Sequence, residues 1–170
     1  MKLAYDESEL VQNRTSLLIF GGTMAERHAW AEEAQRAFPD EGALVEVTAL
    51  TELPAALARK GGVVYLPDVV ALGGDAQAAL MRCLQHQEER PKLIIGLLRS
   101  TRAVLDDGAV REDLHYRLKG ARVDLGSPDV QAAIKRRRAE QPAPGKSRLA
   151  EAVRTPRAAA KVKPPSHSRR

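Results

Sequence analysis

Short apolar runs recur along the first 125 residues, and segments with helical spacing of apolar positions lie between them. Runs of four to six residues that are apolar throughout are typical of strands buried on both faces of a sheet. The sequence predicts five strands, at residues 16–20, 44–48, 63–66, 93–98 and 121–125, of which the first, third and fourth are almost wholly apolar.

The segments between these strands have the spacing of amphipathic helices. We predict helices at residues 23–38, 53–59, 75–86, 101–105 and 110–118. Asp75 is a favourable N-cap for the third of them. Its apolar positions share one face: Ala76, Leu80, Cys83 and Leu84. Strands that alternate with helices predict an α/β fold in three layers, with a parallel sheet of about five strands covered on both faces.

The composition changes after Gly126, where six of the ten prolines lie. Residues 126–170 contain 12 Lys/Arg and 3 Asp/Glu, a net charge of +9, whereas residues 1–125 carry a net charge of −4. From residue 141 onward the chain has too little apolar area to order itself, so we expect a disordered basic tail. The predicted organisation is a lead-in, an α/β domain, a basic helix or linker, and this tail, at 1–13, 14–125, 126–140 and 141–170.

Composition excludes several classes of protein. The single cysteine, Cys83, allows no internal disulfide, which fits a reducing compartment. No apolar run approaches the roughly 20 residues of a membrane span. The first ten residues lack the apolar stretch of a signal peptide. We therefore expect a cytoplasmic protein with no membrane contact.

The most specific motif is the segment Val-Arg-Glu-Asp-Leu-His-Tyr-Arg-Leu at 110–118, which places Arg111 and Arg117 on a short helix. It resembles the Phe-Arg-Glu-Asp-Leu-Tyr-Tyr-Arg-Leu signature of bacterial enhancer-binding proteins, the AAA+ ATPases that activate sigma-54 RNA polymerase. Residues 77–85 are similar to the family's Gln-Ala-Lys-Leu-Leu-Arg-Val-Leu-Gln. The resemblance covers about residues 14–125 and implies an AAA+, P-loop-like fold. The family's lid domain and its sigma-54-contacting loop have no counterpart in this sequence.

The resemblance places Gly21 to Arg27 at the family's phosphate-binding loop. Such a loop needs glycines, so that backbone N–H groups can surround the phosphates, and a lysine for the β and γ phosphates. Here the family's second glycine is Glu26 and its lysine is Arg27. The stretch from Thr23 to Glu26 also matches a helix-capping box, which would place a carboxylate where the anion would bind.

Residues 61–69 resemble the family's Walker B strand, Gly-Gly-Thr-Leu-Phe-Leu-Asp-Glu-Ile. The aspartate that holds Mg²⁺ is replaced by Pro67, and the glutamate that positions water is replaced by Asp68. We favour Asp68 as a solvated residue at a strand end over a catalytic role. We expect neither metal, nucleotide, other cofactor nor ATPase activity. The altered nucleotide-site positions are Gly21, Gly22, Glu26, Arg27, Pro67 and Asp68.

In the family, arginines of the Arg-Glu-Asp segment reach across a subunit interface. The resemblance therefore implies a partner interface at Arg111, Glu112, Asp113 and Arg117. The alternative is that both arginines pair with Glu112, Asp113 or Asp124 of the same chain and hold the helix on the sheet. The sequence leaves both interpretations open.

A second candidate surface is the basic run of residues 135–138, which consists of Lys135, Arg136, Arg137 and Arg138. Clustered cations without interleaved aromatics bind phosphate backbones non-specifically, with a strong dependence on salt. The same charges can hold an acidic protein partner or keep the chain in solution.

These features support three functional hypotheses. The first is a non-catalytic pseudo-ATPase that binds and regulates a cytoplasmic protein partner, by sequestering or inhibiting it, with an AAA+ relative as one candidate. The second is a transcriptional regulator of the sigma-54 pathway that binds nucleic acid through the basic tail. The third, a weak ATPase, is the least favoured because the magnesium ligand is missing.

Overall fold

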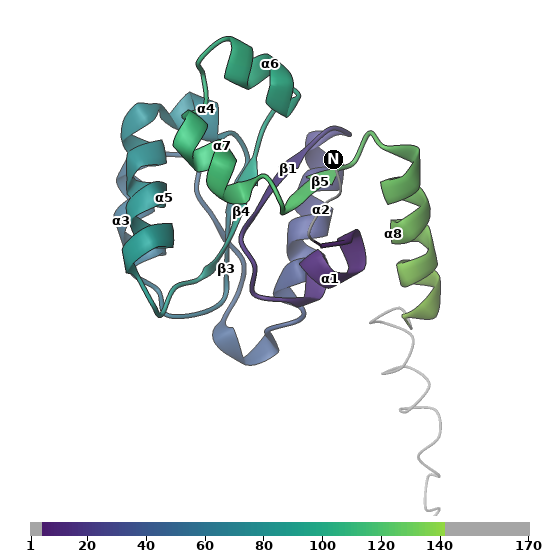
Figure 1. Ribbon diagram of the computed structural model, residues 1–170. Coiled ribbons are helices and arrows are strands. Elements are labelled where there is room, and N and C mark those ends of the chain that lie inside the picture. The colour runs from purple at the N-terminus through teal and green to yellow at the C-terminus, as the bar shows by residue number, and fades with distance from the viewer. Residues whose placement is uncertain (1–4, 142–170) are drawn as a thin grey trace, which may run out of the picture. The chain divides into compact units, whose positions relative to one another are not determined.

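A computed structural model describes residues 5–141, and it contains one parallel sheet of five strands in the order β2-β3-β4-β1-β5 (Figure 1). The strands are β1 (Leu17–Phe20), β2 (Val45–Glu46), β3 (Val63–Leu66), β4 (Lys92–Gly96) and β5 (Arg122–Asp124). The predicted α/β fold and the five predicted strands are confirmed. Residues up to Arg137 form one compact unit and a second begins at Arg138. The predicted disordered tail falls almost wholly outside the described residues.

Eight α-helices lie within residues 5–141: α1 (Glu7–Gln12), α2 (Met24–Gln35), α3 (Leu53–Leu57), α4 (Val69–Leu72), α5 (Gly74–His86), α6 (Thr101–Asp106), α7 (Glu112–Leu118) and α8 (Pro128–Glu140). Two 3₁₀ turns lie at Pro39–Glu41 and Leu50–Glu52. Helices α1 and α4 were not predicted. Of the helices in this part of the chain, none is long and apolar enough to cross a membrane.

The start of α5 differs from the prediction. Gly73, with φ of +86°, is the N-cap, so Asp75 lies in the first turn. The reason is that the unpredicted α4 ends at this glycine, and the chain enters α5 directly from a left-handed conformation that glycine adopts without strain. Asp75 still faces the positive end of the helix dipole.

Every strand pair in the sheet is parallel, and β1 lies between β4 and β5. The residues immediately after β1, β3 and β4 therefore meet at one edge of the sheet, which we term the carboxyl edge. The residues that precede β1 and β4 meet at the opposite edge, the amino edge. Ligands of open parallel sheets usually bind at the carboxyl edge.

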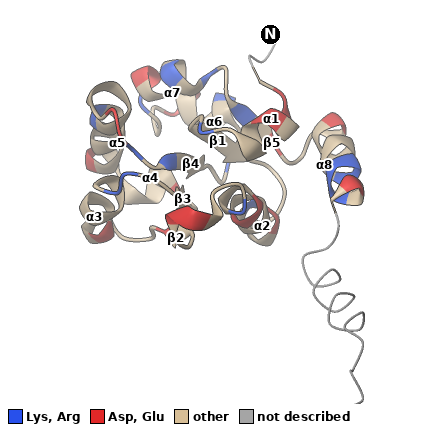
Figure 2. Cartoon of the chain, turned by 90° about the horizontal axis from the view of Figure 1, so that it is seen from below, with Lys and Arg blue, Asp and Glu red and all other residues tan. Residues whose placement is uncertain are grey.

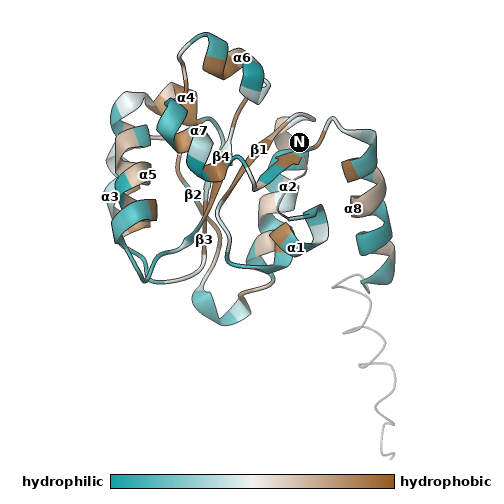
Figure 3. Ribbon diagram, in the orientation of Figure 1, coloured by the Kyte–Doolittle hydropathy of each residue, from teal (hydrophilic) through white to brown (hydrophobic). Residues whose placement is uncertain are grey.

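Two apolar cores cover the two faces of the sheet, and Figure 3 shows the apolar strands between helices of mixed character. One core packs α3, α4, α5 and α7 against side chains such as Leu66 and Ile95. The other packs α1, α2 and α8 against side chains such as Ile19 and Tyr65, and it encloses Trp30 completely. The predicted apolar face of α5 is buried in the first core. The three-layer arrangement is thus built from alternate residues of the same short strands.

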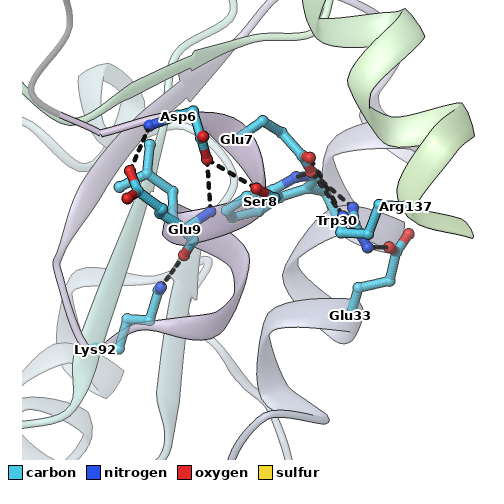
Figure 4. Close-up of polar contacts among 9 residues, drawn as sticks. Asp6, Glu7, Ser8, Glu9, Trp30, Glu33, Lys92 and Arg137 are labelled. Atoms are coloured by element: carbon cyan, nitrogen blue, oxygen red, sulfur yellow. Dashed lines mark hydrogen bonds and ion pairs between the residues drawn. The ribbon is translucent and has the colours of Figure 1, made fainter. Parts of the chain in front are cut away.

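A buried polar cluster joins α1, α2 and α8 (Figure 4). Arg137 donates to the Glu7 carboxylate, with Nη2 2.6 Å from Oε1, and it also pairs with Glu33. Trp30 Nε1 donates to the same Glu7 oxygen at 2.8 Å. The side chains of Glu7 and Arg137 are 3% and 6% exposed. Because this pair is desolvated, its hydrogen bonds are needed to offset the cost of burying the charges.

Helix α1 is held at both ends. Asp6 and Glu9 form a capping box at its start, the sequence signal that could have predicted this helix. At its end, the buried Lys92 amine donates to the carbonyl oxygens of Leu10 and, at 2.6 Å, Asn13. Burial lowers the pKa of Lys92 to about 7. The helix therefore depends on an amine that carries little charge above neutral pH.

We predict that Arg137→Ala lowers the free energy of unfolding by roughly 3–5 kcal/mol, because it leaves the buried Glu7 carboxylate without its cation. Urea unfolding followed by circular dichroism measures this change. Arg136→Ala removes an exposed neighbour of the same type and should change stability by less than about 0.5 kcal/mol. Equal stabilities of the two variants would contradict the role of the cluster.

We also predict that stability rises with pH between about 7 and the ordinary lysine pKa of about 10.4. In this window the unfolded chain binds a proton at Lys92 and the folded chain does not, so the slope is positive and at most about 1.4 kcal/mol per pH unit. Lys92→Met should remove this part of the slope. Measuring the unfolding free energies of the native chain and the variant at several pH values tests this prediction. If the two plots of free energy against pH are parallel, Lys92 does not titrate in this range.

Candidate functional site

The turn between β1 and α2 contains Gly21 and Gly22, with φ of +71° and +63°. A residue with a side chain would be strained at these positive φ angles, which explains why both positions are glycine. The backbone of Gly21 also lies close against the end of β5, where an added Cβ would be 2.6 Å from the amide nitrogen of Gly126. The turn is therefore packed against its own sheet.

The capping box predicted at the start of α2 is confirmed. Thr23 Oγ1 accepts from the Glu26 amide at 3.1 Å, and the Thr23 amide donates to Glu26 Oε2 at 2.7 Å. The helix consequently starts at Met24. Residues that form an open glycine-rich loop in the resembled family are wound into the first helical turn here. Two amides that could have faced a phosphate are used inside the turn.

The Glu26 carboxylate lies over the turn, where it would collide with a Cβ atom at Gly22. A phosphate at this position would meet a like charge. At about 4 Å and an effective dielectric constant near 20, each such pair costs roughly 4 kcal/mol. The turn is thus capped by an acidic group of its own helix.

Arg27 is buried, with only 4% of its surface exposed. Its Nη1 donates to the carbonyl oxygens of Gly21 at 2.8 Å and Gly22 at 2.9 Å. Burial raises the pKa of the neighbouring Tyr65 hydroxyl, and the charge and hydrogen bond of Arg27 partly oppose that rise. The guanidinium therefore fills the inside of the turn and closes it.

At the end of β3, Pro67 is buried and offers no side-chain oxygen to a metal. Asp68 is the N-cap of α4, and its Oδ1 accepts from the amides of Val70 at 3.1 Å and Ala71 at 3.3 Å. The prediction of a merely solvated strand-end residue missed this role. The missed signal is the pattern of an N-cap aspartate, four apolar residues and a C-terminal glycine.

The neighbouring strand leaves no space beside Pro67. An added Cβ at Gly96 would lie within 2.6 Å of the Leu66 carbonyl oxygen. The ends of β3 and β4 are therefore in close backbone contact at the carboxyl edge. Among residues 5–141 there is no group of three or more metal-ligating side chains.

At the start of α7, Arg111 pairs with Asp113, with Nε 3.1 Å from Oδ1 and Nη2 2.9 Å from Oδ2. This bond lowers the pKa of the Asp113 carboxyl group. Both side chains remain about half exposed. The Arg111 amide donates to Gln77 Oε1 at 2.7 Å, which ties α7 to α5. The intramolecular pairing left open by the sequence therefore exists for Arg111, on a surface that is still accessible.

Arg117 lies near the other end of α7 and donates from Nη2 to the carbonyl oxygen of Leu84 at 2.6 Å. Within residues 5–141 it has no carboxylate at ion-pair distance, so the predicted pairing with an acidic residue does not occur. Arg111 and Arg117 thus contact opposite ends of α5 and do not converge on one point.

A groove between α5 and α7, which we term the α5–α7 groove, has a volume of about 680 Å³. It brings together three of the four predicted interface residues and adds Tyr116, which is 69% exposed. Its lining residues are Met81, Gln85, Glu112, Asp113, Tyr116 and Arg117. Tyr116 was not predicted as a surface residue, although a tyrosine between two polar positions of a short helix is a usable signal.

Figure 2 shows Lys and Arg residues along α8, but not all of this basic run is exposed. Lys135, Arg136 and Arg138 are exposed, whereas Arg137 is buried against Glu7 and Glu33. The prediction that Arg137 belongs to a basic binding surface is therefore wrong. The helical spacing from the buried Ile134 to Arg137 is three residues, which places both on the face that packs on α1 and α2.

Comparisons with known proteins support the fold. No family model and no curated protein sequence matches the chain. Among solved structures, NtrX from Brucella abortus in complex with ATP matches with a TM-score of 0.57 and 17% identity over 70% of this chain and 35% of NtrX. The P-loop NTPase domain of the sigma-54 transport activator from E. coli matches with a TM-score of 0.54 and 20% identity over 69% of this chain and 92% of that domain.

The chain spans about a third of the NtrX structure, whereas it corresponds to nearly the whole of the E. coli domain. At these identities the likeness concerns the fold. It agrees with the resemblance read from residues 110–118 and 77–85, which lie on α7 and α5. The chain therefore has an α/β fold like that of the P-loop NTPase domain of the sigma-54 transport activator.

Proposed function

We propose that this protein is a non-catalytic relative of the sigma-54 activator ATPases, which acts by binding and regulating a protein partner. The observation that carries the proposal is the closed β1–α2 turn, in which Arg27 bonds both glycine carbonyls and Glu26 covers Gly22. A triphosphate needs this space, because the fold binds phosphates on the amides of that turn.

The other half of the site supports the same proposal. Phosphoryl transfer depends on positioning and on the charge of a bound metal ion. Pro67 supplies no ligand, and the Asp68 carboxylate is occupied in capping α4. A weak ATPase would need a magnesium ligand in place of Pro67 and a free carboxylate in place of Asp68. We therefore rank this function last.

The α5–α7 groove is the surface on which we place the partner. Its exposed tyrosine has the character of an interface anchor, because tyrosine adds a large contact area at a low entropy cost. Lys119 Nζ lies 4.0 Å from the centre of the Tyr116 ring, and this cation–π contact restricts the motion of the ring. Glu112, Asp113 and Arg117 would form a polar rim. An AAA+ relative is one candidate partner, because α7 carries the segment that the resembled family uses between subunits.

A second candidate function is nucleic-acid binding in transcriptional regulation. It is favoured by the exposed cations Lys135, Arg136 and Arg138 on one helix. Because Arg137 is buried, it adds no charge to the exposed surface of α8, which weakens the argument for nucleic-acid binding. The basic tail that the sequence adds to this surface lies outside the described residues.

We predict that the protein gives no saturable heat with Mg²⁺ and ATP in isothermal titration calorimetry, whereas an active P-loop NTPase in the same buffer does. Any ATP hydrolysis in a preparation should persist unchanged in Arg27→Ala and Asp68→Ala and so be assigned to a contaminant. Micromolar ATP binding by the native chain would refute the closed turn as a barrier.

We predict that Tyr116→Ala lowers the capture of a protein partner from native lysate by at least about 30-fold, as the loss of a 2 kcal/mol anchor implies. Tyr5→Ala removes another exposed tyrosine and is the matched control. Nuclease treatment separates the two candidate functions. Capture that survives Tyr116→Ala but disappears with nuclease and with added salt would favour nucleic-acid binding instead.

A further inference from the structure

The amino edge of the sheet carries a cavity of about 360 Å³ that belongs to neither the closed turn nor the α5–α7 groove. Three arginines from distant parts of the chain line it: Arg14 before β1, Arg90 before β4 and Arg117 in the last turn of α7. Its other lining residues are Thr15, Ser16, Leu84 and Leu118, so no acidic side chain lines the cavity.

Two of the three guanidinium groups are positioned by backbone oxygens. Arg90 Nη1 donates to the carbonyl of Gln87 at 2.9 Å, and Arg117 Nη2 donates to the carbonyl of Leu84 at 2.6 Å. These bonds fix each planar group but leave it other N–H donors, since a guanidinium has five. For neither arginine is a carboxylate at ion-pair distance within the described residues. Their charges are therefore oriented without being neutralised.

Arg14 is the third arginine that lines the cavity. It forms a two-pronged pair with Glu41, which is not a lining residue of the cavity, and its guanidinium lies 4.5 Å from the centre of the Phe38 ring. Both contacts restrict a side chain that would otherwise move freely in water. The cavity is thus bordered by three cations against one adjacent carboxylate.

The hydroxyl groups of Thr15 and Ser16 add donors of a second kind. Ser16 is buried and its Oγ accepts from the Leu93 amide at 3.0 Å, so its hydrogen can be donated to a further acceptor. Guanidinium groups with nearby hydroxyls match the several oxygen acceptors and the double charge of a phosphate better than they match a monovalent carboxylate. The volume lies within the range of small-ligand sites and exceeds what one ion needs.

We propose that this cavity is a binding site for a phosphate group attached to a larger molecule, held by Arg14, Arg90 and Arg117 at the amino edge of the sheet. The site is separate from the closed β1–α2 turn, since Ser16 precedes β1 at one edge of the sheet and Gly21 follows β1 at the other. It does not depend on whether the α5–α7 groove binds a protein, although Arg117 borders both.

The test is a titration of the full chain with inorganic phosphate at constant ionic strength, followed by NMR of the arginine Nε–H and backbone amide signals. Saturable shifts should appear around Arg90, Arg117 and Ser16. Arg90→Gln and Arg117→Gln should each weaken binding by about tenfold, as expected for one charge-assisted hydrogen bond. Arg90→Lys, which keeps the charge, should weaken it less.

Arg102→Gln is the matched control, because it removes one exposed arginine from α6, away from this cavity. It should leave binding unchanged. Shifts that never saturate, equal effects of the Arg90 and Arg102 variants, or acetate binding as tight as phosphate binding would each overturn the proposal. Since Arg90→Gln leaves the α5–α7 groove intact, loss of phosphate with retained partner capture separates this site from the proposed function.

Two probes then distinguish the source of the phosphate. Glycerol 1-phosphate represents a free metabolite, and a short phosphoserine peptide represents a phosphorylated protein. Tighter binding of either probe than of inorganic phosphate supports the site and identifies its source. If both bind more weakly than inorganic phosphate, the cavity does not accept an attached group, and that part of the proposal is wrong.

Discussion

The hydrogen bonds from Arg27 to the carbonyl oxygens of Gly21 and Gly22 are the interaction on which the rest of this structure depends. They hold together a turn of two left-handed glycines, which lets α2 start at Met24 directly beneath it. With the helix placed there, Trp30 reaches the second core and Glu33 reaches Arg137. An element that in other proteins of this fold opens toward a ligand is here an internal structural support.

This support changes where binding surfaces can arise. At the carboxyl edge, Gly96 lies in close backbone contact with the end of β3, and the Asp68 side chain accepts from the first amides of α4. The polar groups at this edge are therefore used within the chain. The accessible, incompletely neutralised groups lie instead on the helices and at the amino edge. Tyr116 is exposed on α7. The guanidinium groups of Arg90 and Arg117 are fixed by backbone carbonyl oxygens, and within the described residues neither has a carboxylate at ion-pair distance.

The alternation of apolar strands and amphipathic helices was sufficient to predict the sheet and both covered faces, and the spacing of Thr23 and Glu26 predicted the capping box of α2. Helices α1 and α4 are six and four residues long and were missed, because their main sequence signal is an aspartate N-cap and not apolar periodicity. The closing role of Arg27 and the burial of Arg137 could not be predicted, since each depends on which oxygens the tertiary fold brings near. Local sequence shows a charge but not its partner, and Glu7 lies 130 positions away from Arg137.

That long separation has a consequence for the limits of the folding unit. The pairing of Glu7 with Arg137 joins the two ends of residues 5–137 across α2, so neither end is an appendage of the sheet. A chain shortened to the strands and their connecting helices would lose both Glu7 and Arg137, and the buried Trp30 Nε1 would lose its acceptor. A substitution that removes the charge of either Glu7 or Arg137 therefore affects both α1 and α8, although the two helices lie near opposite ends of residues 5–137.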